Sequence, residues 1–227
     1  MNPESMAPAI RAVAERFELV FADSPKLIDD VHRLRYQVYC LERGFEPARD
    51  GRESDPADAF SAHVLVRDRA NGRPVGTVRL IAPALARGAA RMPVCEIAGG
   101  ETWHHLPYAE TAEISRFALS KRVRAESGVS DSLLRLLLMR GIVALSGRLG
   151  LTHWCALMEP CLLRLLRASG IRFQPVGAPV DHHGLRQPVV GVIAEVLGRI
   201  AHEKPLIWDF ITHGGTLWQE PALNIAA

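Results

Sequence analysis

The sequence predicts an α+β protein in which helices flank a mixed β-sheet. Three observations carry this prediction: short strand-like runs alternate with segments of helical periodicity, a strong hairpin turn joins two of the runs, and no linker divides the chain. The resulting order is strand, helix, three strands, helix, strand, helix and strand. Because each of these elements must bury one apolar face, a sheet flanked by helices is the economical architecture.

The first elements are a strand and a helix, followed by a loop. Residues 17–23 alternate apolar and polar side chains, as a strand does. Apolar residues recur at steps of three and four across residues 25–42, which is typical of an amphipathic helix. Residues 44–61 are rich in Gly, Pro, Asp and Arg and poor in apolar side chains, which predicts a loop.

A hairpin and a further strand occupy the middle of the chain. Residues 63–67 and 75–81 form the hairpin, with Asn71-Gly72 as its turn. Residues 83–107 are irregular, and residues 112–119 form the next strand.

The remaining segments follow from capping residues and helix-ending glycines. The expected elements are a helix over 132–148 that Asp131 caps and Gly150 ends, a strand over 153–158, and a helix from Pro160 to Gly170. Two further segments follow, 171–176 and 188–197. Either both are strands, or the first is a strand and the second a helix.

Bulk composition indicates one globular domain over residues 1–227, with residues 1–16 as a flexible or helical extension. The chain is 48% hydrophobic and 23% charged, which is typical of a globular protein. Its net charge of +2 does not indicate a nucleic-acid-binding protein. No secretory signal or membrane-spanning run is evident, so a cytoplasmic protein without a membrane span is expected. The four cysteines lack the spacing of a zinc site, and we expect no metal.

The segment Glu113-Ile114-Ser115-Arg116-Phe117 sets two charges inside an apolar strand. Buried charges persist only when they are paired or when a ligand completes them. Burial also raises the pKa of a carboxylate, which suits Glu113 to act as a general base near neutral pH. Residues three apart on a regular strand face opposite sides, so Glu113 and Arg116 share a site only if a β-bulge interrupts the strand.

The element order resembles the GNAT acyltransferase superfamily, and the charged residues narrow the resemblance. The pattern Arg35-x3-Tyr39-x5-Phe45, Asp55-x2-Asp58, Arg79 and Glu113-x2-Arg116 resembles the acyl-homoserine-lactone synthases, and the chain is also similar to the long-chain N-acyl amino acid synthases. Four stretches resemble the acyltransferase family associated with PEP-CTERM/exosortase systems: Gly76–Ile81, Ala112–Ala118, Trp154–Pro160 and His183–Pro188.

This resemblance implies a GNAT-like, mostly antiparallel central sheet with helices on both faces, and a bulge whose freed backbone N–H points at a thioester oxygen. It implies Glu113 and Arg116 as catalytic residues, with Arg116 either holding Glu113 ionised or binding a substrate carboxylate. The substrate-binding residues that it implies are Arg35, Tyr39, Phe45, Asp55, Asp58, Arg79 and Trp154.

Several of these residues also have a purely structural interpretation. Asp55 and Asp58 either attract the ammonium of an acceptor or form an Asx turn with a surface ion pair. Arg79 either contacts substrate or ties its strand to the loop. Arg35 is otherwise a solvated helix position, and Trp154 otherwise packs in the core. The histidine pairs at 104–105 and 182–183 are interpreted as loop histidines.

The donor site departs from the usual pattern of enzymes that use coenzyme A. The glycine-rich loop is missing before the long helix, although backbone N–H groups there, with Arg122 and Arg124, suit a phosphate. Acyl carrier protein, whose arm presents one phosphodiester, and acyl-CoA both remain as donors. No tightly bound cofactor is expected.

The leading functional hypothesis is an N-acyltransferase that moves a fatty acyl chain from a carrier thioester to the amino group of an amino acid or related amine. The partners would be acyl carrier protein and a small amine. One alternative is an autoinducer synthase of the acyl-homoserine-lactone type. Another is a non-catalytic module that binds acyl ligands or carrier protein, because fold alone does not establish activity.

Overall fold

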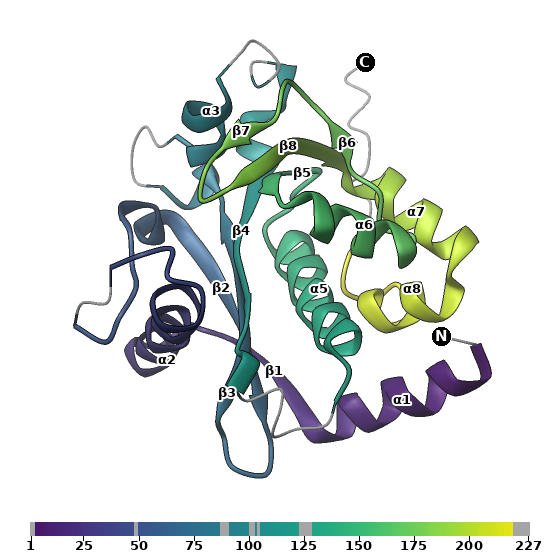
Figure 1. Ribbon diagram of the computed structural model, residues 1–227. Coiled ribbons are helices and arrows are strands. Elements are labelled where there is room, and N and C mark those ends of the chain that lie inside the picture. The colour runs from purple at the N-terminus through teal and green to yellow at the C-terminus, as the bar shows by residue number, and fades with distance from the viewer. Residues whose placement is uncertain are drawn as a thin grey trace.

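The computed structural model describes residues 3–47, 50–86, 91–99, 103, 105–122 and 129–219. Its central feature is an open, mostly antiparallel sheet flanked by helices, as the sequence predicts (Figure 1). The main path through the sheet runs β1-β2-β3-β4-β5-β8-β6, and β7 pairs with β8. The strands are β1 (Phe17–Phe21), β2 (Ser61–Asp68), β3 (Pro74–Ile81), β4 (Thr111–Leu119), β5 (His153–Met158), β6 (Gln174–Pro175), β7 (Val180–Asp181) and β8 (Leu185–Val192).

Helices cover both faces of this sheet. They are α1 (Pro3–Arg16), α2 (Pro25–Arg35), the π-helix η1 (Tyr36–Glu42), α3 (Pro93–Ala98), α5 (Asp131–Arg148), α6 (Pro160–Ala168), α7 (Ile193–Glu203) and α8 (Pro205–Thr212), with short 3-10 turns η2 (Pro56–Phe60), η3 (Pro83–Leu85) and η5 (Tyr108–Glu110). No helix among these described segments is long and apolar enough to cross a membrane.

The alternating directions of the side chains along β2 show which helix covers which face of the sheet. Val64 and Val66 join the main hydrophobic core with α5, whereas Leu65 between them joins a second cluster with α2. Because successive side chains of a strand point to opposite faces, α5 and α2 lie on opposite sides of the sheet (Figure 1). At Gly141 of α5 an added Cβ would lie 2.5 Å from Val64, so the helix approaches the sheet closely.

Local sequence signals account for most of the boundaries. Ser24 caps α2 by accepting the Leu27 N–H, and Gly72 turns the β2–β3 hairpin with a φ of 69°. The predicted cap of α5 is corrected: Ser130 accepts the Ser132 N–H, and Asp131 is the first helical residue.

The remaining predictions differ from the structure in detail. The helix predicted over 25–42 is α2 followed by the π-helix η1, and the strand predicted over 17–23 ends at Phe21. The region 83–107 includes the short helix α3, which its composition did not signal. The segment 188–197 contains the end of β8 and the start of α7.

The strand β4 carries the predicted β-bulge. Its pairing with β3 shifts by one residue, from Thr77 opposite Ala118 to Arg79 opposite Ser115. The extra residue lies in β4, where Arg116 has a φ of 50°, in the left-handed region that non-glycine residues rarely adopt. One inserted residue reverses the facing of the side chains that follow, so Arg116 lies on the same side as Glu113.

The strands β4 and β5 form the single parallel pair of the described sheet, and they separate along their length. Their pairing runs from Thr111–His153 to Glu113–Cys155, whereas β4 continues to Leu119 and β5 to Met158. The resulting opening in the middle of the sheet positions the candidate site.

Candidate active site

A cavity of about 380 Å³ fills the opening between β4 and β5. Its walls come from both faces of the sheet: Pro93 and Ile97 belong to α3, whereas Met139, Ile142 and Leu166 belong to α5 and α6. The cavity therefore passes through the sheet, with charged groups near α3 and an apolar end near α5 and α6. Its volume is within the range of small-molecule sites.

Glu113 lies at the charged part of this cavity, and it is almost completely buried, with 5% exposure. The backbone N–H of Val94, at the start of α3, donates to its Oε2 at 2.8 Å. Burial raises the pKa of Glu113 to about 7, although the Val94 N–H and the charges of Arg79 and Arg116 act in the opposite direction. Such a carboxylate exchanges a proton near neutral pH, which is the property that a general base needs.

A cluster of six ionised residues, here called the charge cluster, lies beside Glu113. Three guanidinium groups and three carboxylates balance one another, and they come from the helix α2, the loop before β2 and the strands β3 and β4. The members are Arg35, Arg79, Arg116, Glu53, Asp55 and Asp58.

Glu53 is the member that sequence reasoning missed. It is buried and bridges two arginines: Arg35 donates to its Oε2, and Arg116 donates to its Oε1 at 3.0 and 3.1 Å. These contacts hold the pKa of Glu53 below its usual range even though burial opposes its ionisation. Its position two residues before Asp55, in the same polar loop, was the available signal.

Asp55 and Asp58 serve the local fold as well as the charge cluster. Together they form the capping box of η2, in which Asp55 accepts the Ala57 N–H and Asp58 accepts the Asp55 N–H. Arg79 donates to both carboxylates, at 2.6 and 2.7 Å, and to Ser115 Oγ at 3.0 Å. Arg79 thus ties β3 to the loop and to β4.

Arg35 and Asp58 support the site without lining the cavity. Arg35 is fully buried, so its predicted contact with substrate is corrected to a supporting contact with Glu53 and Asp58. Asp58 also lies 3.7 Å from His32 and 3.6 Å from His63. Burial first, and then the nearby arginines, lower the pKa of His63 to about 4 against the pull of Asp58.

Arg116 connects the charge cluster to the mouth of the cavity. Besides its contacts with Glu53, it donates to Asp55 at 2.9 Å, and its guanidinium lies 5.6 Å from the centre of the Tyr39 ring. These ion pairs hold the unusual backbone of the bulge in place.

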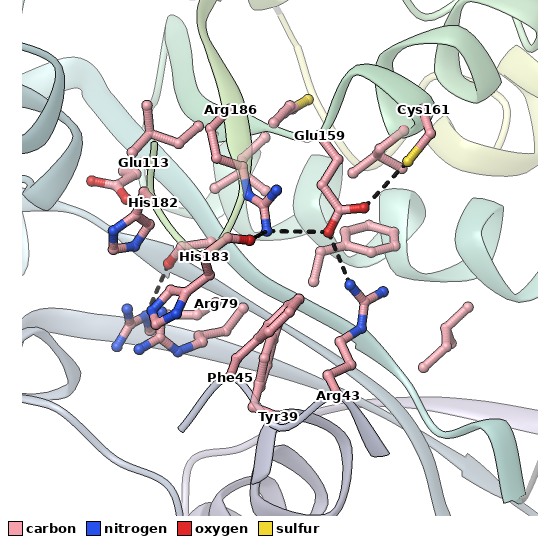
Figure 2. Close-up of a pocket in the computed structure, with 18 of the residues that line it drawn as sticks. Tyr39, Arg43, Phe45, Arg79, Glu113, Glu159, Cys161, His182, His183 and Arg186 are labelled. Carbon is pink, nitrogen blue, oxygen red and sulfur yellow. Dashed lines mark hydrogen bonds and ion pairs between the residues drawn. The ribbon is translucent and has the colours of Figure 1, made fainter. Parts of the chain in front are cut away.

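Aromatic rings frame the mouth, as Figure 2 shows for Tyr39, Phe45, His182 and His183. Phe45 stacks on His183 with ring centres 5.6 Å apart, and it lies 6.4 Å from Tyr39. The two histidines come from the turn between β7 and β8, so this turn meets the segment after η1 across the mouth. The sequence analysis interpreted these histidines as loop residues and did not predict this contact.

A second contact across the mouth involves Glu159, which lies between β5 and α6. Its carboxylate accepts from Arg43 at 2.9 Å and lies 3.3 Å from Arg186 (Figure 2). Three segments that are distant in sequence therefore meet at one carboxylate.

The prediction that Trp154 lines the cavity is wrong, because Trp154 lies in the hydrophobic core. It is fully buried among apolar residues, its indole N–H donates to Ser146 at 2.8 Å, and it does not line the cavity. Met158, which lies four residues after Trp154 on β5, lines the cavity instead.

A carboxylate of the chain itself lies at the start of the segment predicted to bind the donor phosphate. Glu42 accepts the Lys121 N–H at 2.8 Å and the Ser120 hydroxyl at 2.8 Å, and the Arg122 N–H also lowers its pKa. The backbone donors of residues 121 and 122 thus have an anionic partner. Arg124 lies outside the described residues.

Residues 34–133 match the family described as acetyltransferase (GNAT) domain. This range includes the charge cluster, Glu113 and Tyr39. The match covers fewer than half of the residues, and the sheet and its flanking helices have the arrangement of a GNAT-like fold. No curated protein sequence matches the chain.

Solved structures share the fold over most of the chain. TofI, in a ternary complex with an inhibitor and MTA, is 22% identical, with a TM-score of 0.62 over 85% of this chain and 99% of that chain. The AHL synthase LasI is 18% identical, with a TM-score of 0.63 over 81% and 96%. FeeM, an N-acyl amino acid synthase from uncultured soil microbes, is 15% identical, with a TM-score of 0.60 over 81% and 94%.

Replacing Glu53 by Ala tests whether the charge cluster stabilises the fold. The substitution leaves Arg35 and Arg116 without their shared carboxylate, so we expect the free energy of unfolding to fall by about 3–5 kcal/mol. Chemical denaturation measures the change. Arg52→Ala is the control, because Arg52 pairs with Asp29 at the surface and its loss should have little effect. An equally small effect of Glu53→Ala would contradict the prediction.

The raised pKa of Glu113 also predicts how stability depends on pH. Between its ordinary value of 4.5 and about 7, the unfolded chain has lost this proton while the folded chain still holds it. Stability therefore falls as pH rises through that window. Glu113→Gln removes the effect, so the variant should be more stable than the wild type by up to about 3 kcal/mol near pH 8 and equal to it near pH 4. Thermal melts across this range give the comparison, and a variant less stable at every pH would refute it.

Proposed function

We propose that the protein is an N-acyltransferase that moves a fatty acyl group from a carrier thioester to the amino group of an amino acid or related amine. The observation that carries the proposal is Glu113, a buried carboxylate with a pKa of about 7 in a cavity between separating strands. By sequence resemblance, we propose a relationship to the acyltransferases associated with PEP-CTERM/exosortase systems.

In this reaction each group of the site has a distinct role. The amine nitrogen attacks the thioester carbonyl, Glu113 takes a proton from the nitrogen directly or through a water, and the C–S bond breaks as the thiolate leaves. The oxyanion that forms needs a donor, and a backbone N–H at the β4 bulge is the group that we expect to supply it. Arg116 and Arg79 keep positive charge near the reacting groups.

The apolar end of the cavity suits the acyl chain. Met158 of β5, Ile142 of α5 and Leu162 and Leu166 of α6 line it. An acyl chain that entered between the strands would leave its thioester near Glu113 and bury its methylenes on the α5 side. Each buried methylene contributes about 0.8 kcal/mol to binding.

Acyl carrier protein is the donor that we propose. Glu42 accepts from the backbone N–H groups of residues 121 and 122, at the start of the segment where we expect the phosphates of the donor to lie. Placing a pyrophosphate beside this carboxylate is unfavourable because like charges repel. A carrier protein brings one phosphodiester, so less repulsion opposes its binding.

Replacing Glu113 by Gln tests the proposed base. We expect turnover of acyl carrier protein and amine to fall about 100-fold or more, because the amide cannot accept the proton. In the wild type, kcat/KM should rise with pH and level off above about 7. Mass spectrometry of the product separates an acylated amino acid from a lactone, which would indicate an autoinducer synthase. Near-normal turnover by the variant would exclude Glu113 as the base, and carrier binding without turnover by the wild type would indicate a binding module.

Replacing Glu42 by Gln tests the donor assignment. The amide keeps an acceptor for the Ser120 hydroxyl but removes the negative charge, so use of acyl-CoA relative to acyl carrier protein should increase about tenfold. The ratio of the two kcat/KM values gives this directly. Glu46→Gln is the matched control, because Glu46 lines the same cavity but pairs with His183. An unchanged ratio in Glu42→Gln would contradict the assignment.

A further inference from the structure

Phe173, in the segment between α6 and β6, lines two separate cavities. It is at the apolar end of the cavity that contains Glu113, and it also lines a second cavity of about 720 Å³. Among the described residues, no other side chain lines both. The Phe173 ring is therefore the partition between them.

The second cavity lies beyond the end of α6, against the end of β8 and the start of α7. Leu106, Val190 and Val196 give it apolar surface, and charged side chains, among them Arg167, Glu195 and Arg199, complete its lining. The cavity thus offers apolar surface next to Phe173, with charged groups around it.

Trp154 and Gly191 lie next to the Phe173 ring and restrict its position. Phe173 is 7% exposed, and its ring centre lies 6.2 Å from that of Trp154 in the core. On β8, a Cβ added to Gly191 would lie 3.1 and 3.3 Å from the Phe173 ring and 3.1 Å from Val196. Gly191 lines the second cavity, so the absence of a side chain there lets the ring occupy its present position.

We propose that Phe173 sets the length of the acyl chain by closing the apolar end of the cavity, and that Gly191 sets the position of the ring. This inference depends on the proposed acyltransferase function. An acyl chain that extends from the thioester toward α5 and α6 meets the ring, and any further methylene must displace it. Each methylene that fits adds about fourfold to the preference, and each one that does not fit loses packing.

Substitutions at Phe173 and at Gly191 should shift the preferred acyl chain length in opposite directions. Phe173→Ala removes the partition and joins the cavities, so the preferred acyl chain becomes longer. Gly191→Ala pushes the ring toward the first cavity, so the preferred chain becomes shorter. A general loosening of the protein cannot produce both shifts.

The experiment measures kcat/KM for a series of saturated acyl carrier proteins of increasing chain length. We expect the ratio of the next longer even-numbered chain to the wild-type optimum to rise about tenfold or more in Phe173→Ala, and to fall in Gly191→Ala. Phe210→Ala is the matched control, since it removes a buried ring from α8 away from both cavities and should leave the length preference unchanged. If Phe173→Ala does not fold, Phe173→Leu should shift the preference in the same direction by less.

The outcomes separate this inference from the proposed function. A wild type that transfers acyl groups, with the same length preference in the Phe173 and Gly191 variants, overturns the role of Phe173 alone. A wild type that transfers no acyl group overturns the proposed function. In that case displacement of a fluorescent fatty acid by free fatty acids of increasing length still tests the partition, and equal length dependence in wild type and variants would refute it.

Discussion

The extra residue in β4 is the constraint on which the site depends. Without it, Arg116 would point to the face opposite Glu113, and its guanidinium would not line the cavity. The left-handed backbone at Arg116 is unfavourable in isolation. Glu53 and Asp55 hold it through three hydrogen bonds to one guanidinium group, so the bulge and the ion pairs stabilise each other.

The charge cluster and Glu113 are two different electrostatic environments side by side. In the cluster, each carboxylate has arginine partners, and the pKa of Asp58 is held well below its usual range. Glu113 accepts a hydrogen bond from the Val94 backbone N–H, and burial raises its pKa instead. The balanced cluster thus fixes the geometry, while Glu113, outside the cluster, keeps a proton that can be exchanged.

The separation of β4 from β5 gives the cavity two ends with different chemistry. Because neighbouring residues of a strand face opposite sides, Glu113 faces α3 while Ala112 and Ile114 belong to the core with α5. A ligand that passes between the strands therefore meets a titratable group on one face and apolar side chains on the other. This arrangement suits a molecule with a reactive head and a long apolar tail.

Sequence alone predicted β1, α2, the β2–β3 hairpin, β4, α5, β5 and α6, the sheet flanked by helices and the need for a bulge between Glu113 and Arg116. Periodicity and the facing of strand residues are local properties, so the sequence carries them. The pattern also identified Tyr39, Phe45, Asp55 and Arg79, which line the cavity. Only the tertiary structure decided that Glu53 bridges two arginines, that Trp154 belongs to the core, that Glu42 meets residues 120–122, and that Phe173 separates two cavities. Those contacts join segments far apart in the chain, and their partners are set by how the layers pack.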